Sequence, residues 1–187
     1  MRHKVWKLFW DYEKEEKWLN EMSAKGLHMI HYTWAQYIFE EDSQNRYQYR
    51  IELLKDRVVN PESVIYIKFL GENDIEHIAS YMRWIYLRKD VKNGDFDLYT
   101  DKASKIAHYS RVFNVWNTLM IVEGIAGGIN LGIGIINLIL NERLGNFSYG
   151  NISLGISCLV MSVLFWRLGR PLKQKIGKLK RDQIITE

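Results

Sequence analysis

The pattern of hydrophobic and polar positions changes once along the chain, near Asn114. Before this point apolar residues are interleaved with charges. After it lie two long apolar runs, 114–140 and 149–166, of which only the first contains a charge. About 20 helical residues cross the hydrocarbon core of a bilayer. The pattern therefore predicts two transmembrane helices, joined by a short link at 141–148.

The first run is unusually rich in glycine, reading "GIAGGINLGIGIINLIL" over residues 124–140. In a soluble helix each glycine costs about 1 kcal/mol relative to alanine. In membranes glycine is common because it lets helix backbones approach closely. We interpret this run as one arm of a transmembrane hairpin.

The distribution of charge orients this hairpin. The chain has 26 basic and 22 acidic residues and a formal net charge of +4, with basic residues concentrated in the tail, 167–187. Further basic residues precede the first run, at Lys102, Lys105 and Arg111. The positive-inside rule then places both termini in the cytoplasm and the link outside. We expect the tail to lie as an amphipathic helix on the anionic lipid of the inner leaflet.

The part before the first run contains an internal repeat. Residues 13–42 and 61–90 align without gaps at a constant offset of 48, so that Leu19 falls on Ile67 and Ile30 falls on Ile78. Each block is predicted to be a helix followed by two strands, with a further strand ahead of it. The sequence thus predicts an α+β domain over residues 1–100, in which β-α-β-β occurs twice. We expect an antiparallel sheet with two helices on one face, followed by a juxtamembrane helix at 101–113.

Four motifs carry a family resemblance. "EEKWLNEMSAKG" (15–26), "YQYRIELL" (47–54), "IYLRK" (85–89) and "LYTDKASK" (98–105) are similar to the bacterial domain-of-unknown-function family 2812 (DUF2812). The resemblance implies a cytoplasmic domain followed by membrane helices, no agreed activity, and genes that often neighbour a PadR-type transcriptional regulator.

The chain departs from the family pattern at three places. The family tends to have Gly-Trp after each helix, where this chain has Gly26-Leu27 and Asp74-Ile75, and it prefers Phe where this chain has Leu87. If those aromatics line a ligand groove in the family, that groove is altered here.

Aromatic residues supply the candidate partner site. An open sheet face that carries Tyr37, Tyr47 and Tyr49 beside Arg50 would suit a peptide or a small aromatic ligand. The alternative is that these rings belong to the core or to cross-strand pairs. Direct nucleic-acid binding is not expected, because this half of the chain is close to neutral.

Catalytic, metal and cofactor motifs are not apparent. The five histidines show no metal-ligand spacing, and Cys158 is the single cysteine. We therefore expect no enzyme activity, no cofactor and no metal. The leading hypothesis is a membrane-anchored regulatory or sensory protein that binds a partner, for which the resemblance suggests a PadR-type regulator. The alternative is an accessory or immunity subunit that packs against a membrane transporter or toxin.

The first apolar run carries a polar stripe. Glu123, Asn130 and Asn137 recur at seven-residue spacing. An intramembrane carboxylate by default suggests a functional site, such as an ion or proton relay, and the alternative is a seam of helix packing. Arg167 lies at a similar depth on the second arm of the hairpin, so an ion pair with Glu123 is feasible.

A second stripe consists of small residues. Gly124, Gly128 and Gly132 form a ridge at four-residue spacing, and the second run offers a matching small face of Gly155, Cys158 and Ser162. Such ridges promote close helix pairing. We expect packing within the hairpin, with a homodimer as the alternative.

Overall fold

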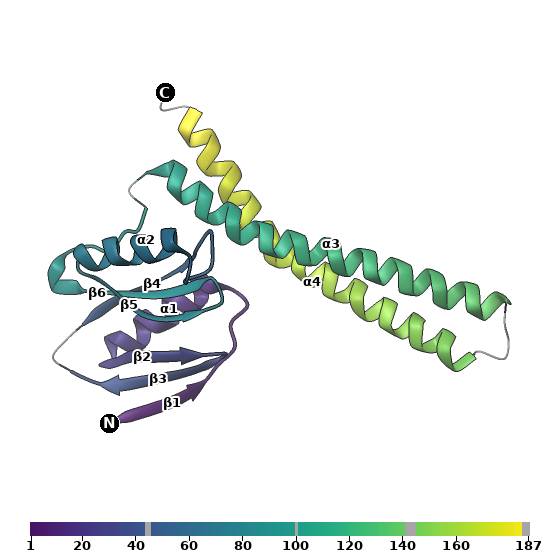
Figure 1. Cartoon of the computed structure of the whole chain (residues 1–187), viewed down its shortest axis with the longest axis horizontal. Helices are drawn as coiled ribbons and strands as arrows, with labels where there is room; N and C mark the ends of the chain where they lie inside the picture. Colours follow the sequence, from purple (N-terminus) through teal and green to yellow (C-terminus); the bar gives the residue numbers. More distant parts are fainter. Residues whose placement is uncertain (44–45, 100, 141–144, 185–187) are drawn as a thin grey trace. The chain divides into compact units, whose positions relative to one another are not determined.

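The chain forms two compact units. The computed structural model describes residues 1–43, 46–99, 101–140 and 145–184. Unit 1 comprises Met1–Asp101, and unit 2 begins at Lys102. Figure 1 shows the α+β architecture of unit 1 and the long helical hairpin of unit 2.

Unit 1 contains six strands and two α-helices among its described residues. In chain order they are β1 (Arg2–Trp6), α1 (Tyr12–Ala24), β2 (Leu27–Thr33), β3 (Gln36–Glu41), β4 (Tyr47–Leu53), α2 (Pro61–Glu72), β5 (Ile75–Tyr81) and β6 (Trp84–Asp90), followed by a short 3₁₀ turn at Val91–Asn93. The strands form two antiparallel sheets with equivalent orders, β1-β3-β2 and β4-β6-β5. The predicted β-α-β-β repeat is therefore confirmed, with its strands divided between two sheets.

The offset of 48 holds even for irregular features. The register of β2 against β3 shifts between Met29 and His31, and that of β5 against β6 shifts between His77 and Ala79. The backbone adopts positive φ at Gly26 (77°), just before β2, and again at Asp74 (62°), just before β5. The two blocks thus share their bulge and their helix exit as well as their element order.

Capping residues set the starts of both helices. Asp11 precedes α1 and accepts a hydrogen bond from the Glu13 amide at 3.0 Å. Asn60 does the same for α2 through the Glu62 amide, also at 3.0 Å, and Pro61 occupies the first turn. Side-chain oxygens at these positions satisfy amides that have no partner within the helix.

Two hydrophobic clusters form the core. The larger is shared by α1 and both sheets, with Leu19, Phe39 and Tyr86 among its buried members. The smaller lies between β6 and α2, and it contains Ile85 and Leu70. Because Tyr86 faces the first cluster and its neighbour Ile85 faces the second, the β4-β6-β5 sheet is covered on both faces.

Unit 2 is a hairpin of two helices, α3 (Lys102–Leu140) and α4 (Gly145–Ile184). Both helices are long and apolar enough to cross a membrane. Helix α3 runs without interruption from the predicted juxtamembrane segment into the predicted span, and α4 continues past Pro171 into the basic tail. Of the predicted link, residues 141–144 lie outside the described residues.

Candidate functional site

The predicted aromatic partner face is not an open surface. Tyr37 lies on β3 of one sheet and Tyr49 on β4 of the other, and each is only 1% exposed. Tyr47 is half-buried, with the Arg88 guanidinium 4.2 Å from its ring centroid. The prediction that these tyrosines form an open face is therefore wrong, because alternate positions of β3 and β4 point into the core between the two sheets.

These positions instead mark where α1 covers the free edge of β4. Asn20 on α1 donates from Nδ2 to the carbonyl oxygen of Tyr49 (3.1 Å) and accepts from the Tyr49 amide (2.9 Å). One helical turn later, Ser23 Oγ donates to the carbonyl oxygen of Tyr47 (2.7 Å) and accepts from its amide (3.1 Å). Two side chains of a helix therefore make the main-chain hydrogen bonds that a neighbouring strand would otherwise make with β4.

Arg50 takes part in the same junction. Its Nη1 lies 3.2 Å from Glu16 Oε1, and Glu16 Oε2 accepts a hydrogen bond from the Ile51 amide at 3.0 Å. Burial raises the pKa of the Glu16 carboxyl, and the Arg50 guanidinium opposes that rise. In this structure Arg50 joins β4 to α1, and it lies beside no exposed tyrosine face.

A buried carboxylate, which sequence analysis missed, joins α1 to both sheets. Glu15 is 7% exposed, and its Oε1 accepts hydrogen bonds from Tyr37 on β3 (2.6 Å) and from Tyr86 on β6 (2.7 Å). Burial raises the pKa of this carboxyl, although the two hydrogen bonds lower it. The same environment raises the pKa of both tyrosines, so their hydroxyls remain donors. The only sequence signal for this role of Glu15 was that the second block has Ser63 at the aligned position.

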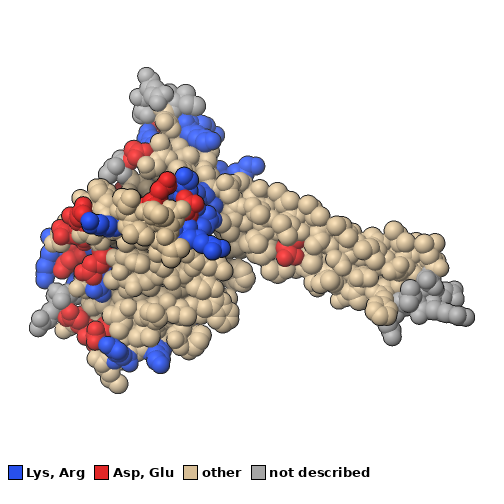
Figure 2. Space-filling model, viewed as in Figure 1, with Lys and Arg blue, Asp and Glu red and all other residues tan. Residues whose placement is uncertain are grey.

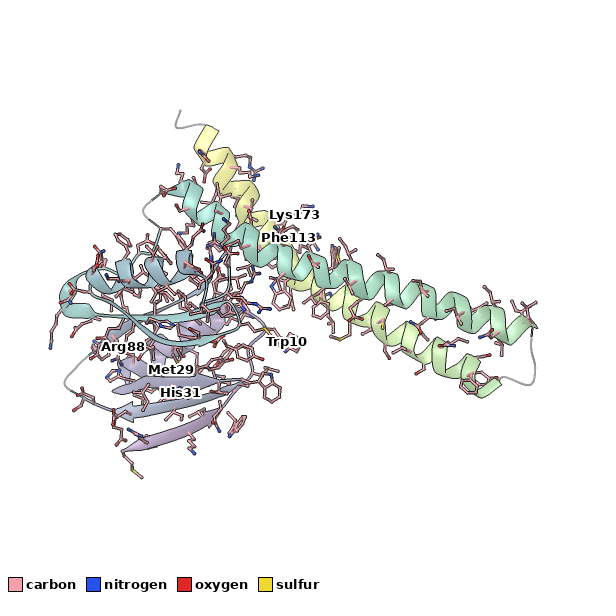
Figure 3. The ribbon with its side chains drawn as sticks, viewed as in Figure 1. Trp10, Met29, His31, Arg88, Phe113 and Lys173 are labelled. Carbon is pink, nitrogen blue, oxygen red and sulfur yellow. The ribbon has the colours of Figure 1, made fainter. Side chains whose placement is uncertain are left out.

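One end of unit 1 exposes large apolar side chains. We call this surface the tryptophan end and define it by five residues that are each more than half exposed: Trp6, Leu8, Trp10, Trp34 and Met82. Figure 3 labels Trp10, whose ring projects outward from the fold. Single exposed apolar residues are ordinary, whereas several at one end of a domain are typical of an interaction surface.

Strand register brings these residues to the same end. Trp6 closes β1 opposite Gln36, which follows the turn that carries Trp34. The β5–β6 turn, with Met82, lies at this end too, because Tyr81, just before it, has its ring centroid 6.1 Å from that of Tyr32 near the end of β2.

The connection from β1 to α1 completes the tryptophan end. It carries Leu8 and Trp10 and leads to Tyr12, whose ring lies 5.4 Å from that of Trp84, the first residue of β6. The loop therefore extends from the β2–β3 turn toward the β5–β6 turn.

In unit 2 the polar stripe borders the seam between the two helices. Glu123 lies near the Cys158 thiol on α4. Over the described parts of α3 and α4 no ion pair joins Glu123 to Arg167, so the pair that sequence depth made feasible is not formed. Asn130 donates to the Ala126 carbonyl of its own helix at 2.8 Å. Asn137 lies on the same side of α3, partly buried.

Three of the glycines where the helices meet, Gly127, Gly134 and Gly155, lie outside the predicted ridge of Gly124, Gly128 and Gly132. A Cβ atom at Gly155 would lie 2.8 Å from the Leu131 amide nitrogen, and one at Gly134 would lie 2.6 Å from the Ile152 side chain. Gly124 also faces α4, next to Ser162, whose hydroxyl donates to the Met120 carbonyl at 2.8 Å. The prediction of packing within the hairpin is correct for Gly124, Gly155, Cys158 and Ser162.

Gly128 and Gly132 do not take part in this packing. A Cβ atom at either position would meet no described atom within 4 Å. The ridge at four-residue spacing winds away from the seam after Gly124, since residues at that spacing drift around a helix of 3.6 residues per turn. This part of α3 remains an open small-residue face.

A groove of about 200 Å³ opens between α3 and α4, where the apolar runs give way to basic residues. Its apolar walls include Phe113 and Met120 on α3 and Trp166 on α4. Its polar groups are Asn117, Arg170 and Lys173. Figure 3 labels Phe113 and Lys173, which approach from the two helices. On the face of the hairpin that Figure 2 shows, its described apolar part carries almost no charged side chains.

Comparison with known proteins identifies the family. Residues 11–121 match the family described as "Protein of unknown function (DUF2812)", and the chain belongs to this family. The match covers most of unit 1 and extends into α3. No curated protein and no solved structure matches the chain.

Proposed function

We propose that this DUF2812 protein is a non-enzymatic, membrane-anchored module that holds unit 1 at the cytoplasmic face and binds a protein partner there. Two surfaces support the proposal: the apolar outside of the hairpin and the tryptophan end. The observation that carries it is the combination of a long apolar hairpin with a polar domain that exposes apolar side chains at one end.

The outer surface of the hairpin suits lipid better than water. Only 11% of the most apolar stretch of α3 and 17% of that of α4 is buried. The exposed side chains are branched aliphatics such as Ile125, Ile129 and Val160, each more than half exposed. A core helix of a soluble protein would bury most of such a stretch. Burial against lipid contributes about 25 cal/mol for each Å² of apolar surface.

The orientation rests on charge. Basic residues flank both apolar runs at the same end of the hairpin, with Lys105 and Arg111 before the run of α3 and Arg167 and Arg170 after that of α4. Such residues are retained on the cytoplasmic side. Unit 1 then lies in the cytoplasm, next to the bilayer.

The tryptophan end is the surface proposed for the partner. Tryptophan is enriched among the residues that contribute most to protein–protein binding, because it buries a large area with little loss of conformational freedom. Trp6 and Trp34, 65% and 62% exposed, are the most exposed of its three tryptophans.

The buried polar groups of unit 1 favour a structural over a catalytic use. Glu15, Glu16 and Asn20 are engaged by tyrosine hydroxyls and by the backbone of β4. Glu15 is buried, and the polar atoms of the partly buried Glu16 and Asn20 are occupied by the main chain of β4. We therefore assign them to the fold and propose that the protein is not an enzyme.

The proposal is tested by purifying the full-length protein from crosslinked membranes of its own host and identifying the bound proteins by mass spectrometry. A PadR-type transcriptional regulator is the partner that the family resemblance suggests. The variant Trp6→Ser/Trp34→Ser should lose the partner, whereas the matched control Ile65→Ser/Phe69→Ser, which changes exposed apolar residues of α2, should retain it. Equal recovery with both variants would contradict the assignment.

One observation favours a second candidate function. The open face at Gly128 and Gly132 lies within the apolar run and has no partner helix among the described residues. An accessory or immunity subunit would use such a face to pack against a membrane transporter or toxin. In that case Gly128→Leu would abolish recovery of the partner, and the tryptophan variant would not.

A further inference from the structure

The groove between α3 and α4 combines three features that one class of ligand shares. Its walls at Phe113, Met120 and Trp166 are apolar, its rim at Arg170 and Lys173 is basic, and no acidic residue lines it. We infer that this groove binds a single anionic phospholipid, with the headgroup phosphate on Arg170 and Lys173 and the start of an acyl chain against Met120 and Trp166. The inference rests on the membrane anchoring proposed above.

The two cations are available for a ligand. Across the part of the chain that the structure describes, no ion pair involves Arg170 or Lys173. The Arg170 guanidinium is held near the groove by Trp166, with its carbon 5.5 Å from the ring centroid. A guanidinium and an ammonium together can hold a phosphate through charge-assisted hydrogen bonds.

The amide of Asn117 adds a neutral polar group deeper in the groove. It lies on α3 between Phe113 and Met120, one helical turn from each, and all three line the groove. A side-chain amide can donate to the ester carbonyl of a lipid while its neighbours contact the chain. The order of groups, from Arg170 and Lys173 through the Asn117 amide to Met120 and Trp166, follows the order of groups in a phospholipid.

The position of the groove along the hairpin matches this ligand. Phe165, which lines the groove, stacks on Trp116 with ring centroids 5.9 Å apart. Aromatic rings are enriched at the level of lipid headgroups, and basic pockets between helices on the cytoplasmic side hold anionic headgroups. A soluble anion would need no apolar wall, and a neutral lipid would need no paired cations.

The inference goes beyond general attraction of the basic tail to the membrane. Lys178 and Lys180 are exposed on the same helix and do not line the groove. They provide a matched control, since replacing them removes the same charge as replacing Arg170 and Lys173. If the groove is the binding site, lipid binding should depend on Arg170 and Lys173 and not on Lys178 and Lys180.

The test uses the full-length protein, delipidated in a non-ionic detergent and titrated with phosphatidylglycerol or phosphatidylcholine of the same chain length. Native mass spectrometry counts the bound lipids. We expect one phosphatidylglycerol to bind more tightly than phosphatidylcholine by about tenfold. Arg170→Gln/Lys173→Gln should abolish that preference, and Lys178→Gln/Lys180→Gln should keep it.

Three results would overturn the inference. These are equal binding of the two lipids by the unchanged protein, equal loss in both double variants, and displacement of the lipid by millimolar inorganic phosphate. The proposed function fails separately: if the protein does not fractionate with membranes, the anchoring is wrong. If the protein is membrane-bound and retains its protein partner but shows no lipid preference, only the inference of lipid binding in the groove is refuted.

Discussion

Asn20 pairs with the main chain of Tyr49 through both the carbonyl oxygen and the amide, at 3.1 and 2.9 Å. A helix side chain thus replaces the strand that would otherwise lie next to β4. Unpaired strand edges invite association with other chains, and native proteins cover or charge them. In unit 1 the covering element is α1, which places β4 under a helix and keeps its tyrosines inside the fold.

The first prediction concerns this pairing. Asn20→Ala leaves the Tyr49 amide and carbonyl without their partners, and each unsatisfied buried group costs about 1–3 kcal/mol. The free energy of unfolding of the full-length protein in detergent, measured by urea titration, should fall by about 1–3 kcal/mol for each of the two groups. The control Glu21→Ala changes an exposed neighbour on α1 and should alter stability by no more than about 0.5 kcal/mol. Equal stability of the two variants would refute the role given to Asn20.

The contact between the polar face of α1 and β4 could not be predicted from the sequence. Glu16, Asn20 and Ser23 recur at helical spacing among many charges, so the pattern is indistinguishable from that of a solvent-exposed face. Likewise, Tyr47 and Tyr49 share one side of a strand, but alternation alone does not say whether that side faces solvent or core. Both answers depend on which helix packs against which strand, and strand order was not readable from the sequence.

The repeat, in contrast, was predictable in detail. Apolar class is kept at the offset of 48 between Leu19 and Ile67 and between Ile30 and Ile78, because both blocks bury the same faces. Packing preserves the apolar class of a position better than its identity. The shared bulge in β2 and β5 had no separate signal, since an inserted residue that both blocks carry leaves their alignment free of gaps.

The second prediction concerns Glu15. Glu15→Ala leaves the hydroxyls of Tyr37 and Tyr86 without their acceptor and should destabilise the protein by about 1–3 kcal/mol for each hydroxyl. Glu15→Gln keeps a carbonyl oxygen in the same place and should remain close to wild type at pH 4.5 and below. If the alanine variant were as stable as the glutamine variant, the two hydrogen bonds would contribute nothing to stability.

The third prediction is the pH dependence of the same site. Burial raises the folded-state pKa of Glu15 above its ordinary value of 4.5. The folded state therefore holds this proton more tightly than the unfolded state, and the contribution to stability is full below pH 4.5 and is lost as pH rises through the folded pKa. The glutamine variant lacks this loss. Its unfolding free energy minus that of wild type should increase between pH 4.5 and 7, and a constant difference would show that the carboxyl is not shifted.

The fourth prediction separates the two glycine faces of the hairpin. Gly155→Ala places a methyl group 2.8 Å from the Leu131 amide nitrogen, so the helices must move apart. Gly128→Ala meets nothing within 4 Å. Thermal unfolding in detergent, followed by the helical circular dichroism signal, should occur at a lower temperature for Gly155→Ala only. Equal destabilisation would mean that Gly128 also contacts α4.

The sequence alone could not show which glycines of α3 face α4, for a geometric reason. Two sets of glycines on α3 look capable of close packing: Gly127 and Gly134, which share the seven-residue spacing of the polar stripe, and the ridge of Gly124, Gly128 and Gly132. Which one meets α4 depends on the rotation of α3 about its own axis. That rotation follows from the fit of the two helices, including the Ser162–Met120 hydrogen bond.

The fifth prediction is the topology of the hairpin. Cys158 is the single cysteine, so Cys158→Ser provides a background for placing one cysteine at a time. Lys105→Cys and Lys178→Cys should react with a membrane-impermeant maleimide only after cells are lysed. Asn146→Cys should react in intact cells. Labelling at 105 or 178 in intact cells would reverse the proposed orientation.

The central claim is that the tryptophan end of a membrane-held domain contacts a protein partner. Its most direct test places the photo-reactive p-benzoylphenylalanine at Trp34 of the full-length protein in living host cells, with the same group at Phe69 on α2 as control. The account predicts a discrete protein adduct on irradiation with the group at position 34 and none with it at position 69. An adduct at position 69 only, or exclusively lipid adducts at position 34, would contradict it.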